Sequence, residues 1–219
     1  VSYQLTPTQK EFFKDTKVLD FKGESLPVYH GTPKSFEVFK ETKDIGFHAG
    51  SIQQANQRII KSKTFSDIEY METGNIMPLH MNIENPMYLP DLNFWYADAI
   101  ASYIKSEYGF KDVPEISPLD FGLDANKEIL DYIKSKGFDG IIYFNEQESD
   151  TPEFKNIQNF LHAEFKTAKE KVEYLINLSK IAGNNKAIDF LSYMAFDSNQ
   201  IKSATAMAEQ PTKDPRISY

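Results

Sequence analysis

Short hydrophobic runs, some alternating and some at helical spacing, divide the chain into strands and helices. The segment 138–144 is the strongest strand, because β-branched and aromatic residues follow one another there. Segments 77–83 and 191–196 predict two further strands. Pro86 should stop the first of them, and residues 199–202 should cap the second and return the chain.

Helical spacing is clear in three other places. Hydrophobic residues recur at helical spacing over 94–108, and another helical stripe runs from Asp124, a capping residue, to Gly137, which is typical of a helix end. The segment 151–190 is rich in Lys and Glu around spaced hydrophobic residues. It predicts two amphipathic helices or one long broken helix.

The first sixty residues place two short strands directly before a helix. One strand carries His30-Gly31-Thr32, and the other is the glycine-flanked aromatic segment 46–49. Residues 51–54, Ser-Ile-Gln-Gln, have the spacing of a capping box, so a helix begins right after the second strand. A glycine after a histidine allows close approach of the backbone to a ligand. His30 is therefore the first candidate for a binding residue.

Composition and charge narrow the possible functions. With 219 residues, 41% of them hydrophobic, the chain is long enough for one sizeable core, and we expect a single domain over 1–205. Residues 206–219 are polar without a period and predict a flexible tail. A net charge of −8 argues against a general phosphate-binding surface. A nuclease or other nucleic-acid effector would need a basic cleft, which a net charge of −8 does not indicate.

Missing residue types exclude several kinds of site. The absence of Cys excludes a disulfide scaffold, a thiolate metal site and a cysteine nucleophile. The four histidines, at 30, 48, 80 and 162, show no ligand spacing, so we predict no metal site. No apolar run reaches the roughly 18 residues that span a bilayer. We expect a soluble, monomeric domain of a larger polypeptide, since the chain starts without Met and shows no membrane segment.

Five segments follow one another in a definite order: Leu5 to Val18, Val28 to Thr32, Met81 to Pro86, Gly137 to Ile142 and Phe196 to Ala204. Together they resemble the PolyVal-type ADP-ribosyltransferase-like domains of bacteriophages and mobile elements, which have the His-Tyr-Glu type of fold. The resemblance covers most of residues 4–205. Only 151–190 looks like an insertion.

The resemblance implies an α+β fold of two small facing β-sheets with flanking helices and a helical insertion near 151–190. NAD would bind in the cleft between the sheets, as substrate and without a metal. His30 matches the histidine that holds the nicotinamide ribose. Gly31 and Thr32 follow it and match the backbone that holds the carboxamide. Tyr29, directly before it, is a further candidate to bind NAD.

The second motif of the resemblance falls on Gly46 and Phe47. Phe47 matches the aromatic residue that packs on nicotinamide, with Phe in place of Tyr, so that stacking is kept and the phenolic hydroxyl is lost. His48 would then point to the opposite face of the strand.

The third motif departs from the family pattern. A glutamate should open the strand near residue 193, and this chain has Ser192 there. A hydroxyl is a poor substitute for a carboxylate that stabilises a cationic ribosyl intermediate and activates the acceptor. Glu146 and Glu148, at the end of the strand 138–144, are the candidates to reach the same cleft, and we favour Glu146.

Structural roles compete with each of these functional ones. His30 is alternatively a buried histidine satisfied by backbone, and Phe47 an ordinary core residue. Glu146 and Glu148 are alternatively a solvated strand end. The Lys/Glu run at 166–173 predicts a solvated helix face rather than a nucleic-acid patch.

Our leading hypothesis is an NAD-dependent mono-ADP-ribosyltransferase, a toxin or effector of a phage or mobile element. It would act in the host cytoplasm or be delivered with a phage particle, and would modify a host protein or nucleic acid. The alternatives are an NAD glycohydrolase and a catalytically weak NAD-binding or interaction module of the same fold.

Overall fold

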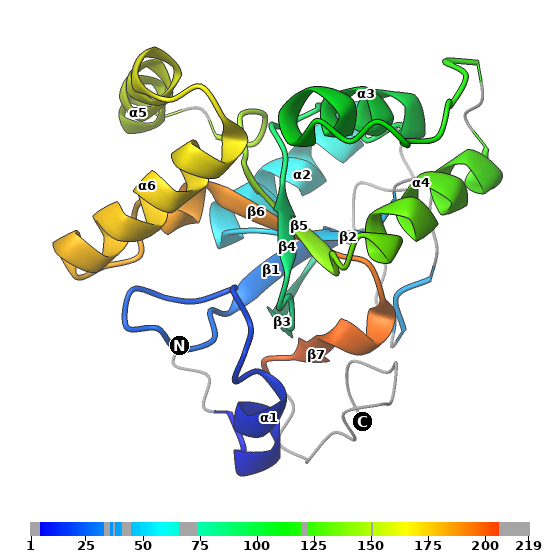
Figure 1. Ribbon diagram of the computed structural model, residues 1–219. Helices are drawn as coiled ribbons and strands as arrows, with labels where there is room; N and C mark the ends of the chain where they lie inside the picture. Colours follow the sequence, from blue (N-terminus) through cyan, green and yellow to red (C-terminus); the bar gives the residue numbers. More distant parts are fainter. Residues whose placement is uncertain are drawn as a thin grey trace.

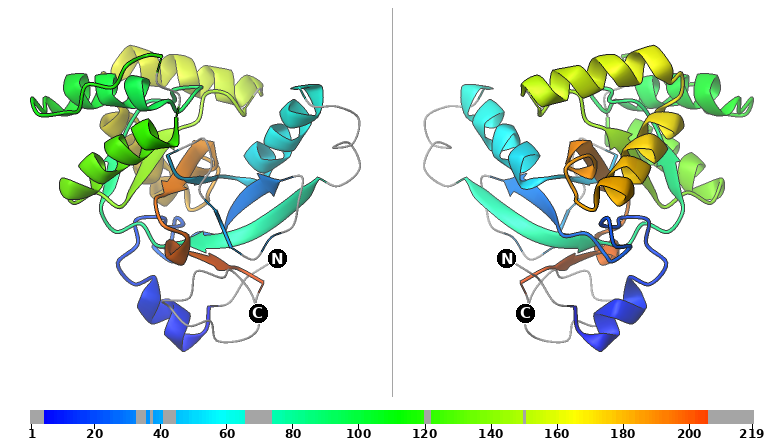
Figure 2. Two further views of the ribbon diagram at one scale, coloured as in Figure 1. Left: turned by 90° about the vertical axis from the view of Figure 1, so that its right-hand side faces the viewer. Right: turned by 90° about the vertical axis from the view of Figure 1, so that its left-hand side faces the viewer.

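Two small β-sheets form the centre of the molecule (Figures 1 and 2). The computed structural model describes residues 5–32, 36, 38–40, 45–65, 74–119, 122–149 and 151–205. The strands are β1 (Val28–Thr32), β2 (Phe47–Ala49), β3 (Asn75–Met81), β4 (Pro86–Tyr88), β5 (Gly140–Phe144), β6 (Leu191–Ala195) and β7 (Ile201–Ser203). The helices are α1 (Pro7–Phe12), α2 (Ile52–Phe65), α3 (Ala97–Tyr108), α4 (Leu123–Ser135), α5 (Pro152–Glu164) and α6 (Ala168–Ala182).

The two sheets meet at β1 and β2. One sheet has the order β1-β3-β7 with antiparallel neighbours, and the other has the order β2-β6-β5-β4, in which β4 runs parallel to β5. A β-bridge joins them, because the backbones of Tyr29 and Gly50 exchange two hydrogen bonds of 2.7 and 3.0 Å. This connection brings the His30 segment beside the end of β2.

Side chains of β5 alternate between two hydrophobic cores, as expected for a strand buried on both faces. Ile142 and Phe144 join a core shared by both sheets and by helices α5 and α6. Ile141 and Tyr143 join a second core under α3 and α4. Figure 1 shows the two helix pairs on opposite sides of this sheet. The α+β fold class with two sheets is therefore confirmed.

The segment 151–190 is helical, and of the two predicted forms it takes the one with two helices. Phe165 is extended, with φ −123° and ψ 132°, which ends α5. Thr167 then caps α6 through a capping box with Glu170, and Gly183 ends α6 with a left-handed φ of 65°. Residues 206–219, for which a flexible tail is predicted, lie outside the described residues.

The strands β4 and β7 were not expected from the sequence. Pro86 does not end the sheet structure but opens β4, because β4 lies at the edge of its sheet, where a missing N–H costs no ladder hydrogen bond. Ile201, placed in a returning cap, instead begins β7 and lies opposite Met81 of β3. Helix α4 starts at Leu123, so Asp124 lies in its first turn rather than at the cap.

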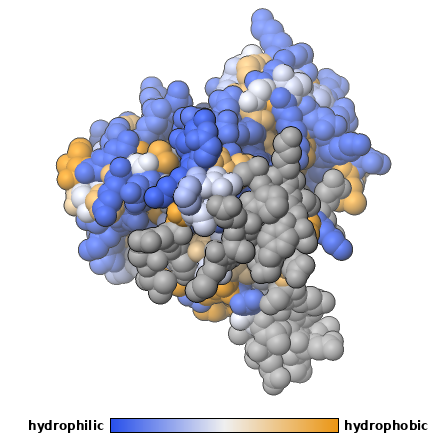
Figure 3. Space-filling view, turned by 90° about the horizontal axis from the view of Figure 1, so that it is seen from below, coloured by the Kyte–Doolittle hydropathy of each residue, from blue (hydrophilic) through white to orange (hydrophobic). Residues whose placement is uncertain are grey.

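The surface carries mostly hydrophilic side chains. Hydrophilic residues dominate the described part of the face in Figure 3, with hydrophobic ones scattered among them. No helix within the described ranges is long and apolar enough to cross a membrane.

Candidate active site

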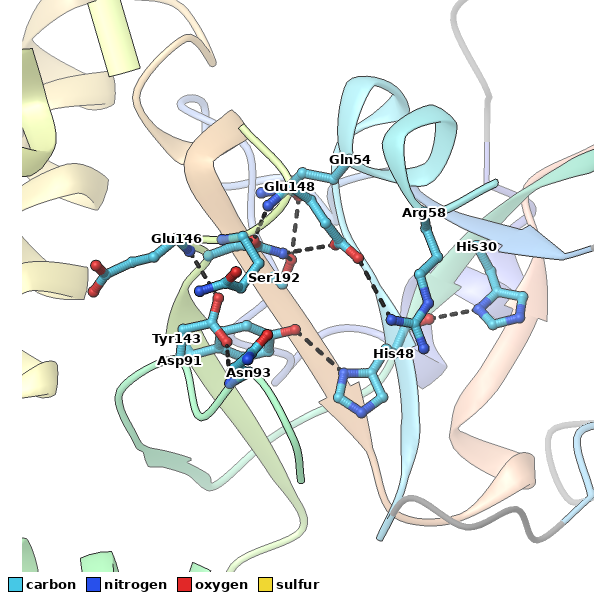
Figure 4. A network of polar contacts seen from close by, with 12 residues as sticks. His30, His48, Gln54, Arg58, Asp91, Asn93, Tyr143, Glu146, Glu148 and Ser192 are labelled. Atoms are coloured by element: carbon cyan, nitrogen blue, oxygen red, sulfur yellow. Dashed lines mark hydrogen bonds and ion pairs between the residues drawn. The ribbon is translucent and has the colours of Figure 1, made fainter. Parts of the chain in front are cut away.

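A network of polar side chains lies where β2 and β5 end and β6 begins (Figure 4). His48, Tyr143, Ser192 and Asn145 come from these strands or directly follow them. Helix α2 adds Gln54 and Arg58, and the segments after β4 and β5 add Asp91, Asn93 and Glu148. The network is thus assembled from four separate parts of the sequence.

Ser192 is buried, with 3% of its surface exposed, and its hydroxyl forms hydrogen bonds with two amide side chains. It accepts a hydrogen bond from Asn145 Nδ2 at 2.8 Å and donates one to Gln54 Oε1 at 3.2 Å. Gln54 Oε1 also accepts the Ser51 N–H at 2.8 Å, which completes the predicted capping box of α2. The Ser192 hydroxyl therefore ties the start of α2 to β6.

Asn145 holds Glu148 next to Ser192. Its side-chain oxygen accepts the N–H groups of Gln147 and Glu148 at 3.0 and 2.9 Å. Its amide nitrogen donates to Glu148 Oε2 at 2.9 Å as well as to Ser192. Asn145 is 2% exposed, so this arrangement is fixed by a buried side chain. The Glu148 carboxylate is consequently brought to the position where the resemblance predicts an acid and the chain has serine.

Glu146 points away from this network. Its Oε2 accepts hydrogen bonds from Gln158 Nε2 at 2.8 Å and His162 Nε2 at 3.0 Å, both on α5, and Figure 4 shows its carboxylate turned to that side. It thus fastens the end of β5 to the helical segment. Of the two candidate glutamates, Glu148 and not Glu146 therefore lies beside Ser192.

His30 is held as a neutral imidazole with a defined tautomer. Its Nδ1 lies 2.7 Å from the backbone oxygen of His48, and because a carbonyl only accepts, Nδ1 must carry the proton. Burial lowers the pKa of His30, and the positive charge of Arg58 lowers it further. In the neutral form Nε2 therefore carries the lone pair, which is suited to accept a hydrogen bond from a ribose hydroxyl.

Arg58 connects the histidine side of the site with the acid side. Its guanidinium lies 3.9 Å from Glu148 Oε1, and its charge acts on both His30 and His48. Figure 4 shows it between Glu148 and His30. The two predicted halves of the site are therefore linked through one guanidinium group.

Phe47 does not offer an open platform for nicotinamide. It is 9% exposed and packs against Phe39, with ring centroids 5.1 Å apart, in the core shared by both sheets. The preceding Gly46 fits closely against β6, where a Cβ would come within 2.7 Å of the Ala195 carbonyl. The structural role foreseen as the alternative for Phe47 is the one observed.

His48 lies on the opposite face of β2, as predicted. Its ring packs near Trp95 and Tyr143, with ring centroids 5.5 and 6.2 Å away, and Nδ1 lies 3.2 Å from the Tyr143 hydroxyl. Burial lowers the pKa of His48 to about 3, so the imidazole is neutral. Burial also raises the pKa of Tyr143 well above its usual value, so this pair is a neutral hydrogen bond.

Gly31 is required by the packing of α2. A Cβ at this position would collide with the backbone carbonyl of Ala55 and lie 3.2 Å from Ile59 Cγ1. The close approach that the sequence suggested for a ligand is thus made by a helix. Thr32, at the end of β1, is buried as well, whereas Tyr29 is partly exposed.

We expect Gly31→Ala to lower the free energy of unfolding by about 1–3 kcal/mol, because α2 must move away from β1. Urea unfolding at neutral pH measures this change. A variant as stable as the wild type would contradict the packing explanation for Gly31.

Several network residues were missed at the level of the sequence. Gln54 was noted only as part of a helix start and Asn145 only as part of a strand end, while Arg58 and Asp91 had no motif around them. Asp91 accepts the N–H of Glu146 at 2.8 Å, and burial raises the pKa of its carboxyl group. The sequence signal for this network was Asn145, a polar residue directly after the strongest predicted strand.

Metal-ligating groups do not cluster in the described part of the chain. Among these residues, no set of three or more His, Asp or Glu side chains is placed to hold a metal ion. The polar network is instead built from amide, hydroxyl, imidazole, guanidinium and carboxylate groups.

Comparisons with known proteins bear on the same site. No match was found among curated proteins or among solved structures. A family model described as ADP-ribosyltransferase in polyvalent proteins matches residues 20–210, a stretch that includes β1, β2, β5, β6 and every network residue. Because this match spans most of the chain, the protein belongs to the family of ADP-ribosyltransferases in polyvalent proteins.

Proposed function

We propose that the chain is an NAD-dependent mono-ADP-ribosyltransferase in which His30 binds the nicotinamide ribose and Glu148 is the catalytic acid residue. One observation supports this most: Asn145 bonds both the Glu148 carboxylate and the Ser192 hydroxyl. Ser192 on β6 stands where the family pattern has a glutamate. In this proposal Glu148, from the segment after β5, supplies the missing carboxylate.

The chemistry requires few groups. The bond between ribose C1 and the nicotinamide nitrogen breaks, nicotinamide leaves with the bonding electrons, and the ribose passes through an oxocarbenium-like state. Glu148 would stabilise that positive charge and then accept the proton of the attacking acceptor group. His30 would orient the ribose by accepting a hydrogen bond at Nε2. Gly31 and Thr32 would supply backbone groups to the carboxamide.

The biological role that we propose is that of a toxin or effector of a phage or mobile element, which modifies a host macromolecule. A protein acceptor fits the net charge of −8 better than a nucleic acid does. With water as the acceptor, the same site would act as an NAD glycohydrolase.

A second candidate function is a weakly active NAD-binding or interaction module. The burial of Phe47 favours it, because the aromatic platform for nicotinamide then has to come from another residue. Such a module would bind NAD without releasing nicotinamide faster than background.

Nicotinamide release from NAD separates the two candidates. We expect release by the wild-type chain and a rate about 10- to 100-fold lower in His30→Ala, since a hydrogen bond in the reacting complex is lost. His162→Ala is the matched control, because His162 lies on α5 and its ring contacts Glu146 rather than the network. Equal background signal from wild type and His30→Ala would remove the enzyme proposal.

A further inference from the structure

Arg58 is a cationic side chain beside Glu148 for which the proposed reaction gives no role. Only two of the 24 basic residues are arginines, Arg58 and Arg216, and Arg58 stands over the candidate site. Arg58 is 64% exposed at its side chain, while its contact with Glu148 Oε1 is 3.9 Å long. An ion pair of this length with one exposed partner is weak and can be replaced by a better one.

Helix α2, which carries Arg58, is packed against β1 and tied to β6. A change in the position of the guanidinium group therefore involves the Arg58 side chain and not the helix. Ala55 and Ile59 of α2 lie against Gly31 of β1, and Gln54 is tied to Ser192. The Cα of Arg58 is therefore held at the surface beside Glu148. A long guanidinium side chain on a rigid base suits capture of an anion that enters there.

The Glu148 carboxylate is also positioned by a hydrogen bond that does not involve Arg58. Asn145 donates to Glu148 Oε2 at 2.9 Å, whereas Arg58 approaches the other oxygen, Oε1. If Arg58 moved away, the carboxylate would keep its position and lose its neighbouring positive charge. That loss makes Glu148 more effective at stabilising a cationic ribose.

We propose that Arg58 binds the diphosphate of the dinucleotide and in doing so leaves Glu148, so that the acid is released for the reaction only when the substrate is present. The inference rests on the proposed function. A guanidinium forms paired, charge-assisted hydrogen bonds with phosphate oxygens, which are stronger than its long contact with one carboxylate oxygen. When the substrate binds, its diphosphate replaces Glu148 as the partner of the Arg58 guanidinium.

Binding of ADP-ribose to the wild type, Arg58→Gln, Glu148→Gln and the double variant tests the exchange by calorimetry. We expect Arg58→Gln to weaken binding about tenfold and Glu148→Gln to strengthen it severalfold by freeing Arg58. In the Arg58→Gln background the gain from Glu148→Gln should vanish. A gain that persists there reflects general charge repulsion and overturns the exchange.

Two controls test whether binding is specific to Arg58 and whether the ligand is the nucleotide or the diphosphate alone. Lys136→Gln removes a different surface cation, paired with Asp112 at 2.6 Å, and should leave binding unchanged. Inorganic pyrophosphate should bind at least about tenfold more weakly than ADP-ribose if the nucleotide is the ligand. Equal affinities would overturn that assignment.

The outcomes also separate this inference from the proposed function. If ADP-ribose and NAD bind and Arg58→Gln changes neither affinity, the role of Arg58 is wrong while the enzyme proposal stands. If the wild-type chain binds neither compound, both fail.

Discussion

Replacement of Glu148 by glutamine should lower the rate of nicotinamide release from NAD by about 100- to 1,000-fold. Glutamine keeps an oxygen that accepts the hydrogen bond from Asn145 Nδ2, so the local structure is retained while the negative charge is lost. The loss of rate then measures the contribution of the charge to the oxocarbenium-like state. Steady-state release at saturating NAD gives the effect on kcat.

Glu146→Gln is the matched control for this experiment. Glu146 lies two residues away, carries the same charge and accepts its hydrogen bonds from Gln158 and His162 on α5. We expect its rate to stay within about twofold of the wild type, since its carboxylate points to α5 and away from the network. A large loss in Glu146→Gln with none in Glu148→Gln would reverse our assignment of the acid.

Acid should destabilise the protein strongly through His80. His80 on β3 is 1% exposed, its Nδ1 lies 2.9 Å from Ser25 Oγ, and its Nε2 is buried without a hydrogen-bond partner. Burial lowers its pKa to about 4, and Lys202, its cross-strand neighbour on β7, offers no compensating negative charge. A protonated His80 is therefore poorly accommodated in the folded state.

The sign of the effect follows from proton binding. Between the unfolded pKa of about 6.5 and the folded pKa of about 4, the unfolded chain binds more protons, so stability falls as the pH falls through this window. His80 alone should cost about 3 kcal/mol of unfolding free energy by pH 4. Above about pH 7 its contribution should be constant.

Urea unfolding at pH 7, 5 and 4 measures this loss. In His80→Gln, which cannot ionise, we expect the midpoint to fall less between pH 7 and 4 than in the wild type. His162→Gln removes a half-exposed histidine and should keep the wild-type slope. An unchanged slope in His80→Gln would show that other groups control acid unfolding.

The order of the main helices and strands was accessible from local sequence. Capping boxes at Thr6 and Ser51, together with β-branched residues in β5, fix structure through neighbours close in the chain. The edge strand β4 was missed because a strand that begins with proline is stable only beside β5, and nothing local encodes that neighbour.

The candidate site was predicted in part. His30 was found because its strand and glycine form a local pattern, but the reason for Gly31 is the packing of α2, which lies more than twenty residues further along the chain. The choice between Glu146 and Glu148 depended on which way each side chain turns after β5. Asn145 and the helix α5 decide that direction.

The sequence by itself determined the family and the mixture of elements and singled out His30 as a candidate, because these depend on residue order and short-range spacing. Only the tertiary structure decided which carboxylate stands beside Ser192, why Phe47 is buried and that Arg58 faces Glu148. The contacts that hold Glu148 join residues 47 positions apart (Asn145 and Ser192) and 90 positions apart (Arg58 and Glu148), and Phe47 is buried in the core. Packing and hydrogen bonding between distant segments select one arrangement there.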